Sequence, residues 1–374
     1  MSRIVLIIAL ILPVSYELSE LVRYTAFALC MASLVIITLM HQRTTISCLT
    51  VSMVLFWASA ISLICTLVLN GDIDKKISTI LNVWLIALTI VSLYFCNLSI
   101  KTISQSFLIA LVIGICLNAA SLSDFDLKSH NTFDLFLGGS VTNFNLWLSL
   151  LFIPSLISIQ PSSDKKSIGW IVLCLSIGLI LMIEILFGGR SGLLILVIAI
   201  YLLYFAKLKT KNILLLSLFF IMFIWLSHLM ASHLRLDRLY NAEWSNTNSI
   251  YLSLNWFSAG RLDQYMFGIE RFIECPLIGC GLGEVDYHGF EIHNVYIRLL
   301  AEGGLILFTI ILIPIFYILS TPANPFFRAV LISALIGGLF EPNLIFGNFG
   351  ISIPFWIIAT YVLRMQDAPE QGHG

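Results

Sequence analysis

The chain has 374 residues, of which 59% are hydrophobic and only 11% are charged. Soluble domains carry roughly 25% charged residues, so this chain needs a bilayer to solvate its apolar surface. The formal net charge of −1 argues against a nucleic-acid partner, because there is no basic excess to neutralise phosphates. We therefore expect an all-α polytopic membrane protein.

Twelve stretches of the sequence are apolar over a length suited to membrane helices, and a spanning helix needs about 20 such residues. The first, Ile4–Val14, is short, but the residues that follow it make a poor cleavage site. We therefore expect a helix there and not a signal peptide. The expected helices are centred near Leu10, Met31, Ala58, Ala87, Ala110, Leu150, Gly178, Val197, Phe219, Ile310, Ile332 and Ile357.

The basic residues of the short loops indicate how the chain crosses the membrane. They gather in alternate loops, and the strongest group is Lys207, Lys209 and Lys211. Because such residues stay on the cytoplasmic side, we expect both termini in the cytoplasm and the chain in a bacterial inner membrane. Three regions follow: about nine helices over 1–230, a periplasmic loop over 231–294, and about three helices with a short cytoplasmic tail over 295–374.

The long outer loop contains one segment with helical periodicity. From 231 to 292 it holds four arginines against eight acids, so any anion site in it must be focal. Ser258 is expected to cap a helix that ends before Pro276 and lies flat at the membrane interface. Arg261 falls in its first turn, near the lipid headgroups; the alternative reading is a solvated interfacial arginine. The apolar positions of this helix are Leu262, Tyr265, Met266, Ile269, Phe272 and Ile273.

A second segment, HNVYIRLLAEGG, begins at His293. His293 and Asn294 are expected to cap a helix that runs through Glu302, where two glycines loosen the chain before the tenth span. His293 at the membrane boundary can act as a general base or a hydrogen-bond donor, or it is simply an interfacial histidine. Arg298 and Glu302 form an i,i+4 pair that we interpret as structural.

A third segment, GGRSG, lies between the seventh and eighth expected spans. The eighth helix should begin on the outer side, so its free N–H groups point outward. With the charge of Arg190, they suit an anion held at headgroup level. The alternative is a tight turn with one arginine that reaches toward the headgroups. Glu184, one turn inward, can pair with an outer-face arginine.

Taken in order, GGRSGLL, GRLDQYMFGIERFIECPLIGCGLG and HNVYIRLLAEGG resemble the O-antigen ligases and the related O-antigen polymerases. These are bacterial inner-membrane glycosyltransferases of the GT-C type, and the likeness is specific from Gly188 to Leu305. The resemblance implies glycan transfer from undecaprenyl pyrophosphate on the periplasmic face. The acceptor is the lipid A–core in ligases and a second lipid-linked repeat unit in polymerases. It implies no cofactor, nucleotide sugar or metal.

The resemblance also implies roles for individual residues. Arg190 and Arg261 would contact the pyrophosphate, and His293 would activate or orient the acceptor hydroxyl. Because no carboxylate pair has the character of a nucleophile, we expect a single displacement with inversion. The remaining candidates are Gly189, Ser191, Asn294 and Tyr296 for substrate binding, with Glu184, Arg298 and His288 as further possibilities. The compact outer loops depart from some relatives, so features those relatives use to hold the acceptor are in doubt.

Two questions stay open at this point. The full H-N-x-Y and A-E-x-G segment favours a ligase over a polymerase, and a transporter or flippase of lipid-linked glycan is the more distant alternative. Glu341 beside Pro342, within the eleventh expected span, is the feature that most favours transport. Cys275 and Cys280 lie in the outer loop and can pair in an oxidising compartment, whereas the other cysteines read as buried apolar residues.

Overall fold

The computed structural model describes a large part of the chain, and every structural statement below concerns that part. The described residues are 2–11, 13, 20–41, 48–67, 73–96, 98–123, 141–159, 176, 178, 180, 190–205, 261–288, 290–320, 325–342, 345–346 and 349–367.

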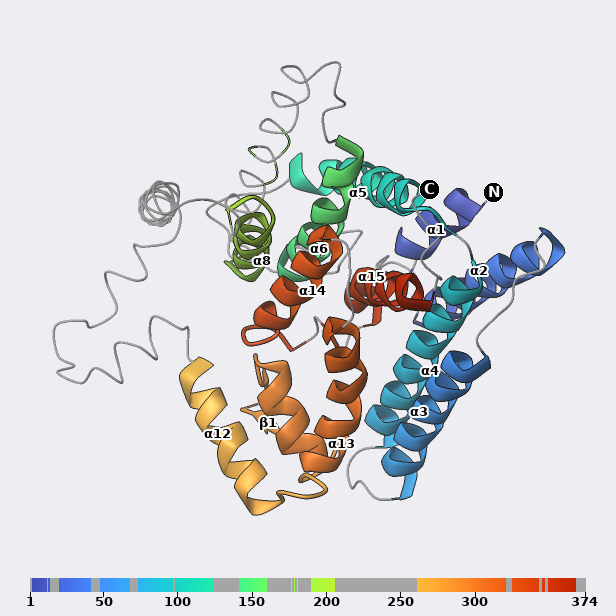
Figure 1. The fold of residues 1–374 in the computed structure, drawn as a ribbon. Helices are drawn as coiled ribbons and strands as arrows, with labels where there is room; N and C mark the ends of the chain where they lie inside the picture. The colour runs from blue at the N-terminus through green and yellow to red at the C-terminus, as the bar shows by residue number, and fades with distance from the viewer. Residues whose placement is uncertain are drawn as a thin grey trace, which may run out of the picture.

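Helices make up nearly all of the described chain (Figure 1). They are α1 (Ser2–Ile11), α2 (Glu20–His41), α3 (Cys48–Leu67), α4 (Ile73–Phe95), α5 (Ile100–Ser123), α6 (Val141–Ile159), α8 (Arg190–Ile200), the π-helical turn η3 (Tyr201–Phe205), α12 (Arg261–Glu274), α13 (Val295–Ser320), α14 (Pro325–Gly337) and α15 (Phe349–Asp367). The sequence did not predict a strand, but β1 (Asp286–Tyr287) and β2 (Phe290–Glu291) pair antiparallel just before α13. The described chain is otherwise helical, so this short hairpin is a local exception within the expected all-α fold.

The apolar helices fit a membrane protein. Among the described residues, three helices are long and apolar enough to cross a bilayer: Ile73–Phe95, Ile100–Asn118 and Val295–Ser320. Every expected span centre lies in a described helix except Gly178, around which only isolated residues are described, and Phe219, which lies outside the described residues. The count of twelve spans and the GT-C arrangement stay predictions.

The starts of several helices meet at one end of the molecule. The Lys75 ammonium, in the first turn of α4, lies 3.7 Å from the Glu291 carboxylate just before α13. The Val295 N–H, at the start of α13, donates to the Gly338 carbonyl at the end of α14, at 2.9 Å. We call the end marked by these contacts the polar end.

Termini of α4, α5, α6 and α15 lie at the opposite end of the molecule. The Arg364 guanidinium, near the end of α15, donates to the Cys96 carbonyl after α4, at 2.8 Å. The Ser104 hydroxyl, near the start of α5, donates to the Pro154 carbonyl late in α6, at 2.7 Å. Among the described helices, α5 and α6 therefore run in opposite directions, as neighbouring membrane spans do. Between the two ends, the core is filled by large buried side chains such as Trp147 and Trp356.

A break in α13 is closed by the loop that follows α12. Gly304 has φ of 63°, which interrupts the helical hydrogen bonding of α13. Four backbone hydrogen bonds join the two segments instead: Cys280 N to Ala301 O at 2.8 Å, Gly281 N to Glu302 O at 3.1 Å, Leu305 N to Pro276 O at 2.9 Å, and Ile306 N to Leu277 O at 3.2 Å. The orphaned groups of the kinked helix are thereby satisfied.

Two glycines make this close backbone contact possible. A Cβ atom on Gly279 would overlap the backbone of Glu302, and a Cβ on Gly304 would overlap the backbone of Leu277. Both glycines also have positive φ, which other residues rarely adopt. We call segments 276–281 and 301–306 together the glycine joint. It explains why P-L-I-G-x-G and A-E-x-G occur together in one sequence.

Candidate functional site

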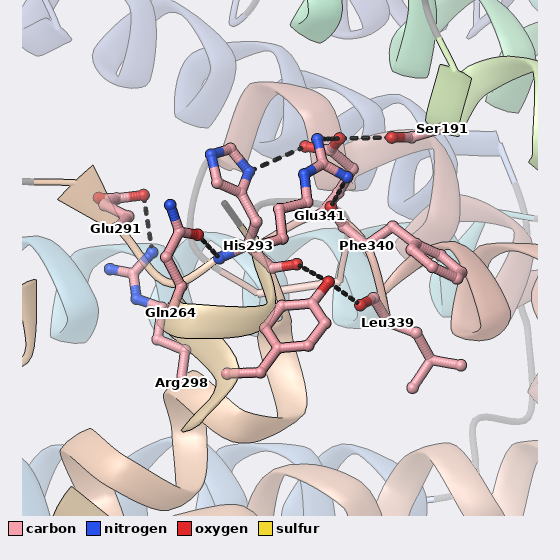
Figure 2. Close-up of polar contacts among 10 residues, drawn as sticks. Ser191, Gln264, Glu291, His293, Arg298, Leu339, Phe340 and Glu341 are labelled. Atoms are coloured by element: carbon pink, nitrogen blue, oxygen red, sulfur yellow. Dashed lines mark hydrogen bonds and ion pairs between the residues drawn. The ribbon is translucent and has the colours of Figure 1, made fainter. Parts of the chain in front are cut away.

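A buried carboxylate at the polar end is the meeting point of several elements. Glu341 lies just beyond α14 and its side chain is only 4% exposed. Its Oε1 accepts hydrogen bonds from the Ser191 hydroxyl, at the start of α8, and from Nη2 of Arg261 at 3.3 Å. Nδ1 of His293 lies 3.9 Å from Oε2. Figure 2 shows Ser191 and His293 approaching Glu341 from different sides.

Arg261 is the first residue of α12 and so lies in its first turn, where the sequence predicted it. Its Nη1 donates to the Phe340 carbonyl at 3.0 Å, and its side chain keeps 25% exposure. Because a guanidinium has five N–H groups, these two bonds leave donors for another acceptor. Arg261 is therefore anchored on one side and open to solvent on the other.

The approach of α12 to α13 depends on small and polar contacts. Gly268 and Gln264 are the buried residues of α12, and a Cβ on Gly268 would overlap side chains of the following segment. The Tyr265 hydroxyl lies 3.0 Å from the His293 carbonyl and 2.9 Å from the Leu339 carbonyl. Burial raises the pKa of Tyr265 while Arg261 opposes the shift, so this hydroxyl remains a neutral donor.

The exposed side of α12 carries three large apolar residues beside Glu270 and Glu274. Met266, Ile269 and Ile273 are all exposed, and they share one side of the helix at i, i+3 and i+7. This arrangement agrees with a helix that rests on lipid through one face. Ser258, the expected cap, lies outside the described residues.

His293 is held through its backbone. Its N–H donates to Oε1 of Gln264 at 3.3 Å, and its carbonyl accepts from Tyr265. The ring is 36% exposed, and its Nδ1 has no hydrogen-bond partner among the described residues. At 3.9 Å from Glu341 this nitrogen is within ion-pair range but beyond hydrogen-bond length.

Asn294 and Tyr296 have structural partners. The Asn294 side-chain oxygen accepts the N–H groups of Tyr296 and Ile297 at 3.0 and 3.1 Å, which is the expected cap of α13. The Tyr296 hydroxyl donates to the Leu335 carbonyl of α14 at 2.5 Å. Both residues fix the start of α13, and through it the position of His293.

A second group of charges at the polar end surrounds Arg298. Its guanidinium donates to Glu302 at 3.2 Å and to Glu291 at 2.9 Å, and Glu302 also accepts the Gly283 N–H at 3.3 Å. The arginine is 15% exposed. Together with Lys75, these residues form what we call the Arg298 cluster. The two carboxylates hold Arg298 in place, which agrees with the structural reading of this pair.

Of the remaining candidate residues, the structure describes His288 and the backbone of Arg190. His288 lies in the turn between β1 and β2 with φ of 52°, and its ring centroid is 4.4 Å from that of Tyr287. Gly189 and Glu184 lie outside the described residues, as does the side chain of Arg190. The Arg190 backbone begins α8, directly before Ser191. The start of α8 therefore borders the Glu341 site.

Glu341 is the residue whose role the sequence did not reveal. It was noted only as an acid beside Pro342 in an apolar span. Burial of a lone carboxylate in such a position costs free energy, so the residue generally has a partner or a function. The sequence therefore contained a signal for the site. The sequence predicts Tyr265 only as part of the apolar face of α12, and it does not predict the bonds of Gln264 and Tyr265 to His293.

The site combines an arginine, a histidine and a buried carboxylate. Within the described ranges, no group of three or more His, Cys, Asp or Glu residues could hold a metal ion. In comparisons with known proteins, no family model matches the chain and no curated protein matches it.

Proposed function

We propose that the chain is an O-antigen ligase, a glycosyltransferase of the bacterial inner membrane. It transfers a glycan from undecaprenyl pyrophosphate to the lipid A–core of lipopolysaccharide. The observation that carries the proposal is the convergence of Arg261, His293 and the start of α8 on Glu341. These are the three places where the quoted sequence segments resemble the ligases and polymerases.

Arg261 is the proposed contact of the leaving pyrophosphate. When the bond to the anomeric carbon breaks, negative charge develops on the phosphate oxygen. The remaining N–H groups of the guanidinium can stabilise it by charge-assisted hydrogen bonds. Its partial exposure of 25% supports this role. Arg190, at the start of α8, is the proposed second contact.

His293 is the proposed proton acceptor. The acceptor sugar hydroxyl attacks the anomeric carbon, the bond from that carbon to the pyrophosphate breaks, and the hydroxyl proton passes to Nε2 of His293. One displacement inverts the anomeric centre. Glu341 lies on the Nδ1 side of the ring and also contacts Arg261, so it positions the base and the anion contact relative to each other.

The proposal places the polar end in the periplasm. Alternate crossing puts the starts of the fourth, eighth and tenth expected spans on that side, together with the end of the eleventh. The contacts of Lys75, Ser191 and Glu341 are consistent with this arrangement. The donor and acceptor are both lipid-anchored, so the exposed apolar side of α12 suits a site at the membrane surface.

The test is the lipopolysaccharide pattern of a strain that lacks the gene, with lipid-linked intermediates extracted in parallel. A ligase predicts bare lipid A–core and polymer that accumulates on undecaprenyl pyrophosphate. Core that carries a single repeat unit would instead identify the polymerase, in which a second lipid-linked glycan is the acceptor. An unchanged pattern would contradict both and turn attention to transport.

Site variants connect that phenotype to the geometry. Arg261→Ala and His293→Ala should fail to restore the pattern, whereas Arg271→Ala should restore it. Arg271 is a matched control, because it lies on the same helix but pairs with Glu274 at 2.6 Å, away from Glu341. Restoration by Arg261→Ala would refute the proposed site.

A further inference from the structure

Two cysteines lie together where α12 ends. Cys275 directly follows the helix, and Cys280 follows the turn that begins at Pro276. Both are free thiols and both are partly buried. The proposed reaction at Glu341 uses neither of them.

The backbone folds these two residues toward each other. The Gly279 N–H donates to the Cys275 carbonyl at 2.9 Å, which closes the turn directly before Cys280. The Cys280 thiol then donates to the Arg271 carbonyl at 3.0 Å, and the Cys275 N–H bonds the same carbonyl at 3.2 Å. Both residues are therefore held at the Arg271 carbonyl, at the end of α12.

We infer that Cys275 and Cys280 form a disulfide in the membrane-inserted protein. This inference rests on the outward orientation in the proposed function, because disulfides persist in oxidising compartments such as the periplasm. It does not rest on the glycosyltransferase activity itself. The turn holds the thiols in proximity, so oxidation requires no rearrangement of α12.

The oxidant is a protein disulfide of a periplasmic thiol oxidase. The Cys275 thiolate attacks that disulfide and displaces one sulfur, which gives a mixed disulfide. The Cys280 sulfur then attacks Cys275 and releases the second sulfur of the oxidant as a thiol. Two electrons and two protons pass to the oxidant. Burial and the adjacent Cys275 raise the pKa of Cys280 to about 11, which makes the Cys280 thiol a poor first nucleophile.

The bond would secure the glycine joint. Cys280 donates its N–H to the Ala301 carbonyl, so a covalent link to Cys275 ties the end of α12 to the kinked segment of α13. Neither cysteine contacts Glu341, Arg261 or His293 in the described hydrogen bonds and ion pairs. The disulfide is therefore structural, and its loss should leave glycan transfer intact.

The test is differential alkylation of the full-length protein in intact cells. Free thiols are blocked with a first maleimide, and a second maleimide is added after denaturation and reduction. Trypsin yields one peptide with both cysteines, bounded by Arg271 and Arg298. We expect this peptide to be two hydrogens lighter than the dithiol and to take up label only after reduction. Cys65, buried in α3, is the control that labels on denaturation without reduction.

Orientation is measured separately with Glu284→Cys, an exposed position on the same loop, in a Cys275→Ser/Cys280→Ser background. A membrane-impermeant maleimide should label it from outside. If it does, and the native peptide is nonetheless a dithiol, the disulfide inference is overturned while the proposed function stands. No labelling from outside would overturn both. An intact disulfide with an unchanged lipopolysaccharide pattern would support the inference and refute the proposed function.

Discussion

Two arginine–carboxylate groups lie at the same end of the molecule, and they differ in how fully the arginine is used. Arg298 binds two carboxylates and is 15% exposed. Arg261 binds one carboxylate and one carbonyl and is 25% exposed. The Arg298 cluster is thus closed on itself, whereas the Glu341 site keeps donors and an imidazole directed to solvent.

The contrast shows that the unused hydrogen-bond donors of an arginine in a membrane protein best indicate whether it can bind a ligand. Both arginines lie near the start of a helix and both contact a buried acid, so residue type alone does not distinguish their roles. Remaining donors, partial exposure and a nearby base do separate them, because a ligand needs all three. Four changes to the chain can break or sharpen this comparison.

The largest effect is expected from Arg298→Ala. Removal of one partner from a buried ion pair typically costs about 3–5 kcal/mol, since the remaining charges lose their counter-ion. Glu302 is buried and would be left with only the Gly283 N–H. Thermal unfolding in detergent should show a much less stable protein. A fully stable protein that has lost activity would instead assign Arg298 to the reaction.

Arg261→Ala should lower the rate of transfer with little change in stability. Loss of a donor to developing negative charge costs about 10²–10³ in rate. The measurement is transfer by the purified protein from a lipid-linked glycan donor to lipid A–core, with Arg271→Ala as the control. A drop in unfolding temperature as large as that of Arg298→Ala would remove the distinction between the two arginines.

Glu341→Gln tests the carboxylate at the centre of the site. The amide keeps the size and can still accept the Ser191 and Arg261 hydrogen bonds, but it has no charge. A hydrogen bond to a charged group contributes about 1.5–3 kcal/mol, so transfer should fall roughly 10- to 100-fold. The same transfer assay measures this fall in rate, and binding of the donor is measured in parallel. Unchanged turnover would show that Glu341 only supports the local fold.

The smallest effect is expected from Asn294→Ala. Loss of the cap of α13 typically costs about 1 kcal/mol of stability, and turnover at saturating donor and acceptor should remain close to that of the unchanged protein. Asn294→Asp, which also caps, should restore the stability. If Asn294→Ala instead raises KM for either substrate while stability is unchanged, the residue binds substrate.

Local signals in the sequence predicted much of this architecture. Local sequence predicted the place of Arg261 in the first turn of α12, the end of that helix before Pro276 and the Asn294 cap. The kink at Gly304 was anticipated from the glycine pair. These features depend on backbone groups within a turn or two of the residue that determines them.

The centre of the site could not be predicted in the same way. Ser191 lies 150 residues before Glu341, and Arg261 lies 80 residues before it. No residue near Glu341 in sequence indicates these partners, because the packing of α8 against α14 brings them together. The β1–β2 hairpin was missed for a related reason: strands of two residues carry almost no periodicity.

The glycine joint has a consequence for how the protein is assembled. The kinked helix exposes carbonyl and N–H groups that a bilayer cannot solvate, and the residues that satisfy them belong to the loop made earlier in synthesis. We therefore expect the insertion of α13 and the placement of that loop to be coupled. A chimaera that takes the loop from one relative and the following helix from another should fail to assemble unless both halves of the joint come from the same parent.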